Sequence, residues 1–236
     1  MKKFLVLIVS AMLIQPNILF AAEGKKMTRS DICKKNYEKL FNSDWNPNVG
    51  SDPEMMAILQ KYIFGEVGVT PLEVRETLYQ CAPFIGFPKT LNAIGVMNEV
   101  FKERGIETPL EMAGTTDEKS RFEKGAAIQK PLYGDEISKA LEGLPENMGE
   151  DVARFLTEFC FGDIYTRNGL DVKKRELMTI SILVTTGDTE TLKSHIKGAL
   201  KAGNSKETIT AAMIQCLPYV GFPKTIAALK CLKGVI

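Results

Sequence analysis

The chain has 236 residues, of which 44% are hydrophobic and 25% charged, and its formal net charge is +1. A chain of this length and composition can bury a sizeable core, which excludes a disordered or fibrous protein. The balanced charge removes any whole-chain electrostatic case for binding nucleic acid. The single histidine, His195, also excludes a metal site built from several histidines of one chain.

The first 21 residues are predicted to be a secretory signal peptide. Lys2 and Lys3 precede an apolar run over residues 4–13, and Ala21-Ala22 provides small residues where a signal peptidase would cut. The run is too short to span a bilayer comfortably, so a transmembrane anchor is the weaker interpretation. We therefore expect an exported protein, periplasmic or secreted, with no membrane contact after cleavage.

A polar arm over residues 22–50 precedes two related segments. Gln80–Thr90 and Gln215–Thr225 share eight of eleven residues at an offset of 135, and the other three positions are apolar in both. A second match joins Phe64–Val67 to Phe161–Ile164 at an offset of 97, so the first copy is 38 residues shorter between the two matches. The sequence therefore predicts two copies of one unit, the first of them truncated.

The stretch that only the second copy holds, about residues 165–202, predicts a helical hairpin. Asp171 can cap a first helix, and a turn around Gly187 separates it from a second helix. The second helix carries apolar residues and the single histidine on one stripe: Leu192, His195, Ile196, Ala199 and Leu200. No strand-like alternation survives anywhere, so we expect an all-α protein.

The predicted organisation has five parts in chain order: a signal peptide over 1–21, an N-terminal arm over 22–50, a degenerate repeat over 51–102, a linker over 103–120 and a complete domain over 121–236. The degenerate repeat lacks the two helices that would cover its apolar face. An apolar face of this kind favours self-association, so we expect a homo-oligomer.

Every cysteine lies after the predicted cleavage site, in a compartment that permits disulfides: Cys33, Cys81, Cys160, Cys216 and Cys231. Five is an odd number, so at least one thiol is unpaired within the chain. No two cysteines have the spacing C-x-x-C, which argues against a thioredoxin-like redox motif and against a zinc knuckle. The alternative interpretation of each is a small apolar core residue.

One set of residues keeps its order and spacing over the second copy: Tyr133-Gly134, Phe161-Gly162-Asp163, Arg175-Glu176-Leu177, His195, Gly203 and Tyr219-Val-Gly-Phe-Pro223. This set resembles the carboxymuconolactone decarboxylase family, which also includes the AhpD-type alkylhydroperoxidases. Residues 34–102 are similar to the same family without its central helical hairpin. The resemblance implies an AhpD-like helical bundle in two tandem copies, the first incomplete.

The thiol branch of this family has the pattern Glu-x11-Cys-x2-Cys-x3-His. Glu176 and His195 occupy its Glu and His positions, but Asp188 and Thr191 stand where the two cysteines would be. Peroxidase chemistry needs a thiolate nucleophile and a resolving thiol, and neither residue supplies one. The substitutions argue against peroxidase activity.

The decarboxylase branch is similar in lacking the cysteine pair. The resemblance implies acid–base chemistry on a small carboxylated substrate, without a metal or an organic cofactor. Loss of carbon dioxide from an unsaturated lactone acid leaves a dienolate that must be reprotonated. His195 and Glu176 are the predicted catalytic residues, because an imidazole exchanges its proton near neutral pH and a carboxylate can fix its tautomer. Arg175 and Tyr219 are the predicted substrate-binding residues, the first through a bidentate contact to a carboxylate.

Each of these residues also has a structural interpretation. His195 could be a satisfied histidine at a helix interface, Arg175 and Glu176 could brace the hairpin as an ion pair, and Tyr219 could simply pack. An axial offset of roughly 7 Å across the hairpin would let Glu176 reach His195 only through extended side chains or a water. Two other functions stay open: a non-catalytic binding or assembly module on the same fold, and a thiol-dependent antioxidant.

Overall fold

The computed structural model describes residues 69–236, and within this range the chain forms helices and turns without a strand. The predicted all-α fold class is confirmed for this part of the chain. The predicted signal peptide, the N-terminal arm and residues 51–68 of the degenerate repeat lie outside the described residues. Export therefore stays a prediction, as do the predicted domain boundaries.

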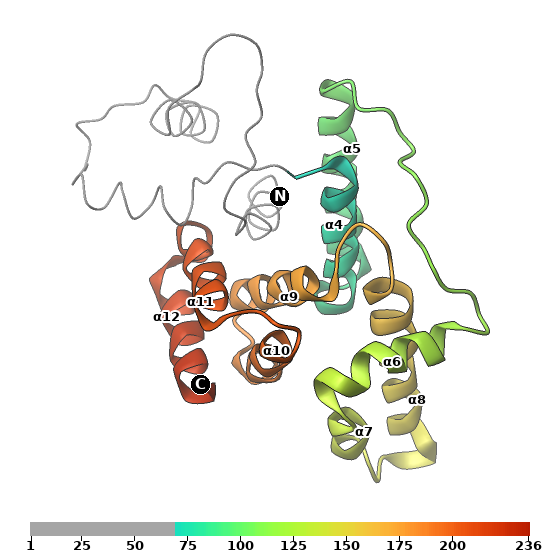
Figure 1. Ribbon diagram of the computed structural model, residues 1–236, viewed down its shortest axis with the longest axis vertical. Coiled ribbons are helices and arrows are strands. Elements are labelled where there is room, and N and C mark those ends of the chain that lie inside the picture. Colours follow the sequence, from blue (N-terminus) through green and yellow to red (C-terminus); the bar gives the residue numbers. More distant parts are fainter. Residues whose placement is uncertain (1–68) are drawn as a thin grey trace.

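The described helices follow one another with short connections, except for the extended linker before α6 (Figure 1). In chain order they are α4 (Pro71–Ile85), α5 (Phe87–Glu103), α6 (Arg121–Tyr133), α7 (Glu136–Ala140), the short helix η1 (Pro145–Asn147), α8 (Met148–Phe155), the π-helix η2 (Leu156–Tyr165), α9 (Val172–Thr186), α10 (Thr189–Lys201), α11 (Lys206–Gln215) and α12 (Leu217–Val235). Within residues 69–236, no helix is both long and apolar enough to cross a bilayer.

The predicted hairpin is found as α9 and α10. Asp171 caps α9 by accepting a hydrogen bond from the backbone N–H of Lys174 at 2.7 Å. Asp188 caps α10 in the same way, with the N–H of Thr191 at 3.0 Å. Each cap satisfies a backbone donor that the first turn of a helix leaves unpaired.

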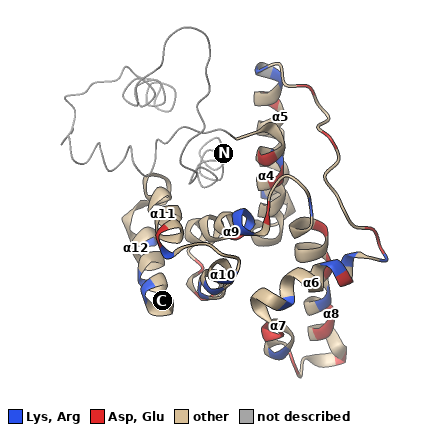
Figure 2. Ribbon diagram, viewed as in Figure 1, with Lys and Arg blue, Asp and Glu red and all other residues tan. Residues whose placement is uncertain are grey.

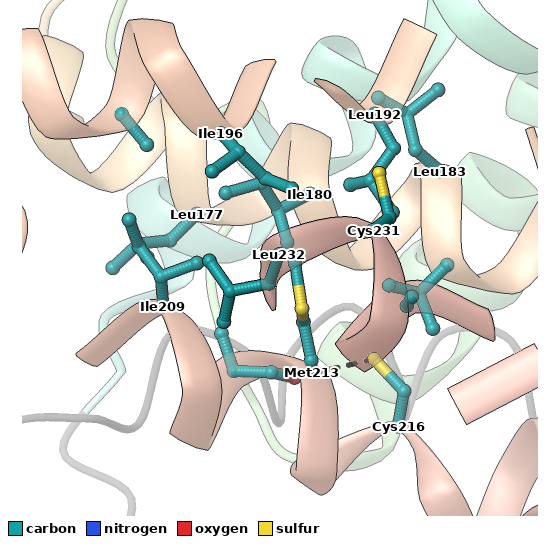
Figure 3. Close-up of a cluster of buried hydrophobic side chains, with 14 of the residues drawn as sticks. Leu177, Ile180, Leu183, Leu192, Ile196, Ile209, Met213, Cys216, Cys231 and Leu232 are labelled. Carbon is teal, nitrogen blue, oxygen red and sulfur yellow. Dashed lines mark hydrogen bonds between the residues drawn. The ribbon is translucent and has the colours of Figure 1, made fainter. Parts of the chain in front are cut away.

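Helix α9 lies at the centre of the molecule, in contact with α4, α10, α11 and α12 (Figure 1). Its side facing α10–α12 contributes to the largest hydrophobic cluster, in which Ile180 packs with Ile196 and Met213 (Figure 3). These three side chains are essentially inaccessible to solvent. Its N-terminal half faces α4, and that contact is polar. Helix α9 is therefore held by hydrophobic packing towards α10–α12. Towards α4 and α5 it is held by a buried polar network and by Ile182, which belongs to a second hydrophobic cluster.

The two Gly-Phe-Pro turns adopt the same local conformation. Gly86 between α4 and α5 has φ 79° and ψ 163°, and Gly221 within α12 has φ 78° and ψ 170°. A positive φ with extended ψ strongly favours glycine, because other residues are strained there. The Thr90 hydroxyl donates to the carbonyl of Gly86, and the Thr225 hydroxyl donates to the carbonyl of Gly221, each at 3.0 Å. This local likeness agrees with the predicted repeat, and the tandem arrangement as a whole stays a prediction.

Candidate active site

The α9–α10 hairpin brings the two predicted catalytic residues into direct contact. The Nδ1 atom of His195 lies 3.1 Å from Oε2 of Glu176. The imidazole is 10% exposed and the carboxylate is completely buried. The side chains of Glu176 and His195 span the axial offset between their positions on the hairpin, so the contact needs no bridging water.

Tyr133, the last residue of α6, completes a three-residue cluster with this pair. Its hydroxyl donates to Oε2 of Glu176 at 2.6 Å and lies 2.7 Å from Nδ1 of His195. The tyrosine and imidazole rings meet edge to face, with centroids 5.1 Å apart. Tyr133 therefore touches both members of the acid–base pair.

A second tyrosine holds the other oxygen of the carboxylate. Tyr165, at the end of η2, donates to Oε1 of Glu176 at 2.9 Å. Burial, reinforced by the neighbouring Glu176 charge, raises the pKa of both Tyr133 and Tyr165 far above the ordinary value. Both phenols therefore remain protonated donors, and Glu176 accepts from each of them.

The hydrogen-bond count assigns the proton on the imidazole. Tyr133 has one hydroxyl proton, which it donates to Glu176, so its oxygen can only accept from His195. Both partners of Nδ1 are then acceptors, and Nδ1 must carry the proton. Nε2 has no hydrogen-bond partner within residues 69–236. In the neutral ring Nε2 thus holds a lone pair that can accept a proton.

Aromatic side chains lie beside the imidazole, and one of them comes from α4, in the predicted first copy. The ring of Phe84 meets that of His195 edge to face, with centroids 5.5 Å apart. When Gln80–Thr90 is aligned with Gln215–Thr225, Phe84 stands at the position of Tyr219. Tyr219 itself packs against the hydrophobic cluster of α9–α12. A role for Tyr219 in binding substrate stays a prediction, while its repeat counterpart lies beside the histidine.

Arg175 is fully buried where α9 meets α4 and the loop that precedes α9. Figure 2 shows the end of α9 next to α4 coloured blue, for basic residues. Its guanidinium donates to the carbonyl of Arg167 at 2.9 Å and to Oε1 of Gln80 at 3.2 Å, and it pairs with Glu76 at 3.5 Å. The contacts favour the structural interpretation, although the partner is Glu76 of α4 and not the expected Glu176. Binding of a substrate carboxylate by Arg175 would require these bonds to open, and it stays a prediction.

The positions that hold cysteines in the thiol branch serve as a helix cap. Asp188 accepts from the Thr191 hydroxyl at 2.6 Å, and the hydrogen bonds of Thr191 lower the pKa of this carboxyl. The four described cysteines are free thiols. All four are buried, Cys231 the least deeply, and burial raises the pKa of Cys216 to about 12 and shifts Cys81 and Cys160 in the same direction. Cys33 lies outside the described residues.

Sequence reasoning did not assign roles to Tyr133, Tyr165 or Gln80. Tyr133 stands in the Tyr-Gly pair that carries the family resemblance, which was the available signal. Tyr165 directly follows the Phe-Gly-Asp-Ile segment, and Gln80 opens the repeated eleven-residue segment. None of these signals says that Tyr133 and Tyr165 converge on the carboxylate of Glu176, or that Gln80 lies between Arg175 and Thr179.

Comparison with known proteins places Glu176 and His195 inside a family match. Residues 150–234 match the model of the carboxymuconolactone decarboxylase family. The 4-carboxymuconolactone decarboxylase of Acinetobacter baylyi is 25% identical over 114 residues, which are 48% of this chain and 84% of that protein. Nitrosuccinic acid decarboxylase npaB of Metarhizium robertsii is 29% identical over 120 residues, 49% of this chain and 82% of that protein.

A third relative matches a longer stretch of the chain. Peroxisomal protein 2 of Schizosaccharomyces pombe is 26% identical over 142 residues, 59% of this chain and 65% of that protein. The family match itself begins after Tyr133 and after all of α4. It therefore contains the acid–base pair but not every residue that touches it.

Proposed function

We propose that the protein is a decarboxylase of the carboxymuconolactone decarboxylase family, acting by acid–base chemistry on a small carboxylated substrate. One observation carries the proposal: Nδ1 of His195 is anchored on Glu176 and Tyr133, while Nε2 has no partner among the described residues. Two of the similar proteins are named as decarboxylases, which supports this class of reaction.

The site suits the protonation step of a decarboxylation. The bond between the carboxylate and its neighbouring carbon breaks, carbon dioxide leaves, and the electron pair moves into a conjugated carbonyl or a similar acceptor. The imidazolium form of His195 then gives the proton on Nε2 to a carbon of the resulting carbanion, either the carbon that lost the carboxylate or the other end of the conjugated system. The neutral imidazole takes a replacement proton from solvent, so one proton is consumed for each carbon dioxide released.

Glu176 stabilises the charged form of the histidine. Its carboxylate lies against the Nδ1–H edge, where it attracts the imidazolium more strongly than the neutral ring. The tyrosine bonds hold the carboxylate in place, so the imidazole edge that faces away from it stays aimed at the same point. A positioned acid or base of this kind contributes about 10²–10⁴ to the rate.

The substrate class follows from the chemistry and from the names of the relatives. Both names denote carboxylic acids that lose carbon dioxide, and the reaction needs an electron-accepting group beside the departing carboxylate. We therefore propose an unsaturated lactone acid or a small acid activated in the same way as the substrate.

A direct test incubates the purified protein with 4-carboxymuconolactone and with nitrosuccinate in deuterated buffer. Decarboxylation should release carbon dioxide and place one deuteron on a carbon of the product, at either end of the conjugated carbanion that the departing carboxylate leaves. His195→Ala, prepared in parallel, should not accelerate the release. If neither acid, nor a wider panel of activated carboxylic acids, reacts faster with the wild type than with His195→Ala, the decarboxylase proposal is wrong.

The burial of the imidazole favours one alternative, a non-catalytic binding or assembly module. His195 is only 8% exposed, and it lines neither the hollow beside the linker nor the groove of about 210 Å³ between α9, α10 and α12. In this case His195→Ala would leave binding to a partner intact. The two functions are separated by whether that substitution removes a measurable activity.

The proposal includes export and self-association. Export rests on the signal-like first 21 residues. Self-association is supported by large apolar side chains that are more than half exposed on several helices: Phe87, Leu91, Phe155 and Phe222.

A further inference from the structure

Helix α4 belongs to the incomplete first repeat, yet one of its side chains reaches toward the acid–base pair of the second. We propose that Gln80 is a positioning residue for His195, acting through a chain of hydrogen bonds that runs from Gln80 to Glu176 in one fixed direction. The inference deepens the proposed function, since it concerns the histidine assigned there to proton transfer. It predicts a property of the resting protein that can be measured without a substrate.

The direction of the chain follows from counting protons. Tyr165 donates its only hydroxyl proton to Oε1 of Glu176, at an O···O distance of 2.9 Å. Its contact with the Thr179 hydroxyl at 3.2 Å must therefore be donated by Thr179. The Thr179 oxygen is in turn free to accept, and Nε2 of Gln80 donates to it at 3.1 Å. Each group donates toward Glu176.

A cation fixes the far end of the chain. Arg175 donates to Oε1 of Gln80 at 3.2 Å, which prevents the amide from exchanging its oxygen and nitrogen. Arg175 is held by the carbonyl of Arg167 and by Glu76. Glu76 accepts from Arg167 at 2.7 Å, so the ion-pair cluster links α4, α9 and the loop before α9. The donor chain begins at a buried positive charge and ends at a buried negative one.

The hydrogen bonds from Gln80 to Glu176 are all buried, so a lost donor cannot be replaced by water. Gln80, Thr179 and Glu176 have no exposed surface, and Tyr165 is almost completely buried. Water therefore has no access with which to replace a lost donor, and a buried polar group left unpaired is costly. With its donors in place, Glu176 remains an acceptor, and the proton on the imidazole stays on Nδ1. Gln80 thus helps to keep Nε2 available.

The presence of one histidine gives the test a clear signal. In protein labelled with ¹⁵N, the imidazole nitrogen shifts report how the neutral ring divides between the Nδ1–H and Nε2–H tautomers. The wild type should hold Nδ1–H as the dominant form. Thr179→Val and Gln80→Leu should each lower the ratio of Nδ1–H to Nε2–H about fivefold, the factor equivalent to one net hydrogen bond of about 1 kcal/mol.

Two matched variants control for general damage. Thr179→Ser keeps the hydroxyl and should restore the wild-type tautomer ratio. Gln215→Leu makes the same change at the repeat counterpart of Gln80, also buried, and should leave the ratio unchanged. Circular dichroism and thermal melting confirm that each variant is folded before its spectrum is compared, and Thr179→Val serves if Gln80→Leu does not fold.

Two results would overturn the proposal: an unchanged tautomer ratio in folded Thr179→Val, or an equal change in Gln215→Leu. Failure of the decarboxylase assay is a separate outcome, because the spectrum is recorded without substrate. Once a substrate is established, Thr179→Val should lower kcat and leave KM near the wild-type value. A change in KM alone would also contradict a positioning role.

Discussion

Gly198 of α10 lies directly against the phenol of Tyr133. A Cβ atom at position 198 would stand 2.7 Å from Cζ of that ring and would also collide with its hydroxyl oxygen. The missing side chain therefore allows α6 and α10 to approach until Tyr133 can touch both His195 and Glu176. The smallest residue in α10 determines where the tyrosine of α6 can sit.

Gly198→Ala should therefore displace Tyr133 and destabilise the fold. Overpacking of a closed interface typically costs about 1–3 kcal/mol. Gly234→Ala is a suitable control, because a Cβ at that helical position meets no atom within 4 Å. Urea denaturation should show a lower free energy of unfolding for Gly198→Ala only. Equal stability of the two variants would contradict the close contact.

His195→Ala should reduce decarboxylation by at least about 100-fold, the lower end of the range for loss of an acid–base group. Glu176→Gln should have an intermediate effect, because it keeps the shape of the side chain but loses the charge that stabilises an imidazolium. Cys216→Ser should lose little activity beyond its effect on stability. Steady-state kinetics on an established substrate would measure all three. Retention of full activity by His195→Ala would remove the histidine from the mechanism.

The buried tyrosines predict a loss of stability in alkali. Burial raises the pKa of Tyr165 well above the ordinary value of about 10, so the folded state keeps a proton that the unfolded state releases. The contribution of Tyr165 to stability is complete below a pH of about 10 and is lost as the pH rises further. In Tyr165→Phe the free energy of unfolding should fall less steeply over this range. If the free energy of unfolding falls equally steeply with pH in the wild type and in Tyr165→Phe, the pKa of Tyr165 is not the cause of the loss.

The carboxylate of Glu76 should be essential for folding. It is fully buried and pairs with Arg75, Arg167 and Arg175. Removing one partner of a buried ion pair costs about 3–5 kcal/mol, since the remaining charges are left uncompensated. Glu76→Gln should show this loss in chemical denaturation. Glu190→Gln, which breaks an exposed pair with Lys193, should leave stability nearly unchanged, because solvent screens that pair.

The thiols of Cys81, Cys160 and Cys216 should be unreactive in the folded protein. Burial raises the pKa of Cys216 to about 12, and Cys81 and Cys160 are shifted in the same direction, so little thiolate forms near pH 8. Ellman's reagent should label these three only after unfolding, and peroxide turnover with a dithiol partner should stay near background. Peroxidase activity that survives His195→Ala and disappears with one Cys→Ser change would restore the antioxidant interpretation.

Local patterns in the sequence predicted the helices and the hairpin well. Asp171, Gly187 and the apolar stripe around His195 are signals within a few residues of one another, and the structure forms α9 and α10 there. The meeting of Glu176 with His195 could also be anticipated, because a hairpin brings its two arms together. Periodicity identified the buried side of each helix in these cases.

The partners from distant segments could not be predicted in the same way. Arg175 pairs with Glu76, which lies 99 residues away, and Tyr133 is 43 residues from Glu176. Periodicity shows that a helix side is buried but does not show which helix covers it. For the same reason the sequence did not indicate that the rings of Tyr133 and Phe84, from α6 and α4, would lie beside His195.

The position of these distant partners affects how counterparts of this protein can be recognised. Gln80 and Tyr133 both precede residue 150, where the family match begins. A comparison over residues 150–234 alone would group proteins by Glu176 and His195. It would not take into account the residues before 150 that contact or position this pair. Chains that share the pair can therefore differ in the state of the histidine and in their chemistry. A helix packed like α4 that carries a glutamine at the position of Gln80 would better identify proteins that position the histidine in the same way.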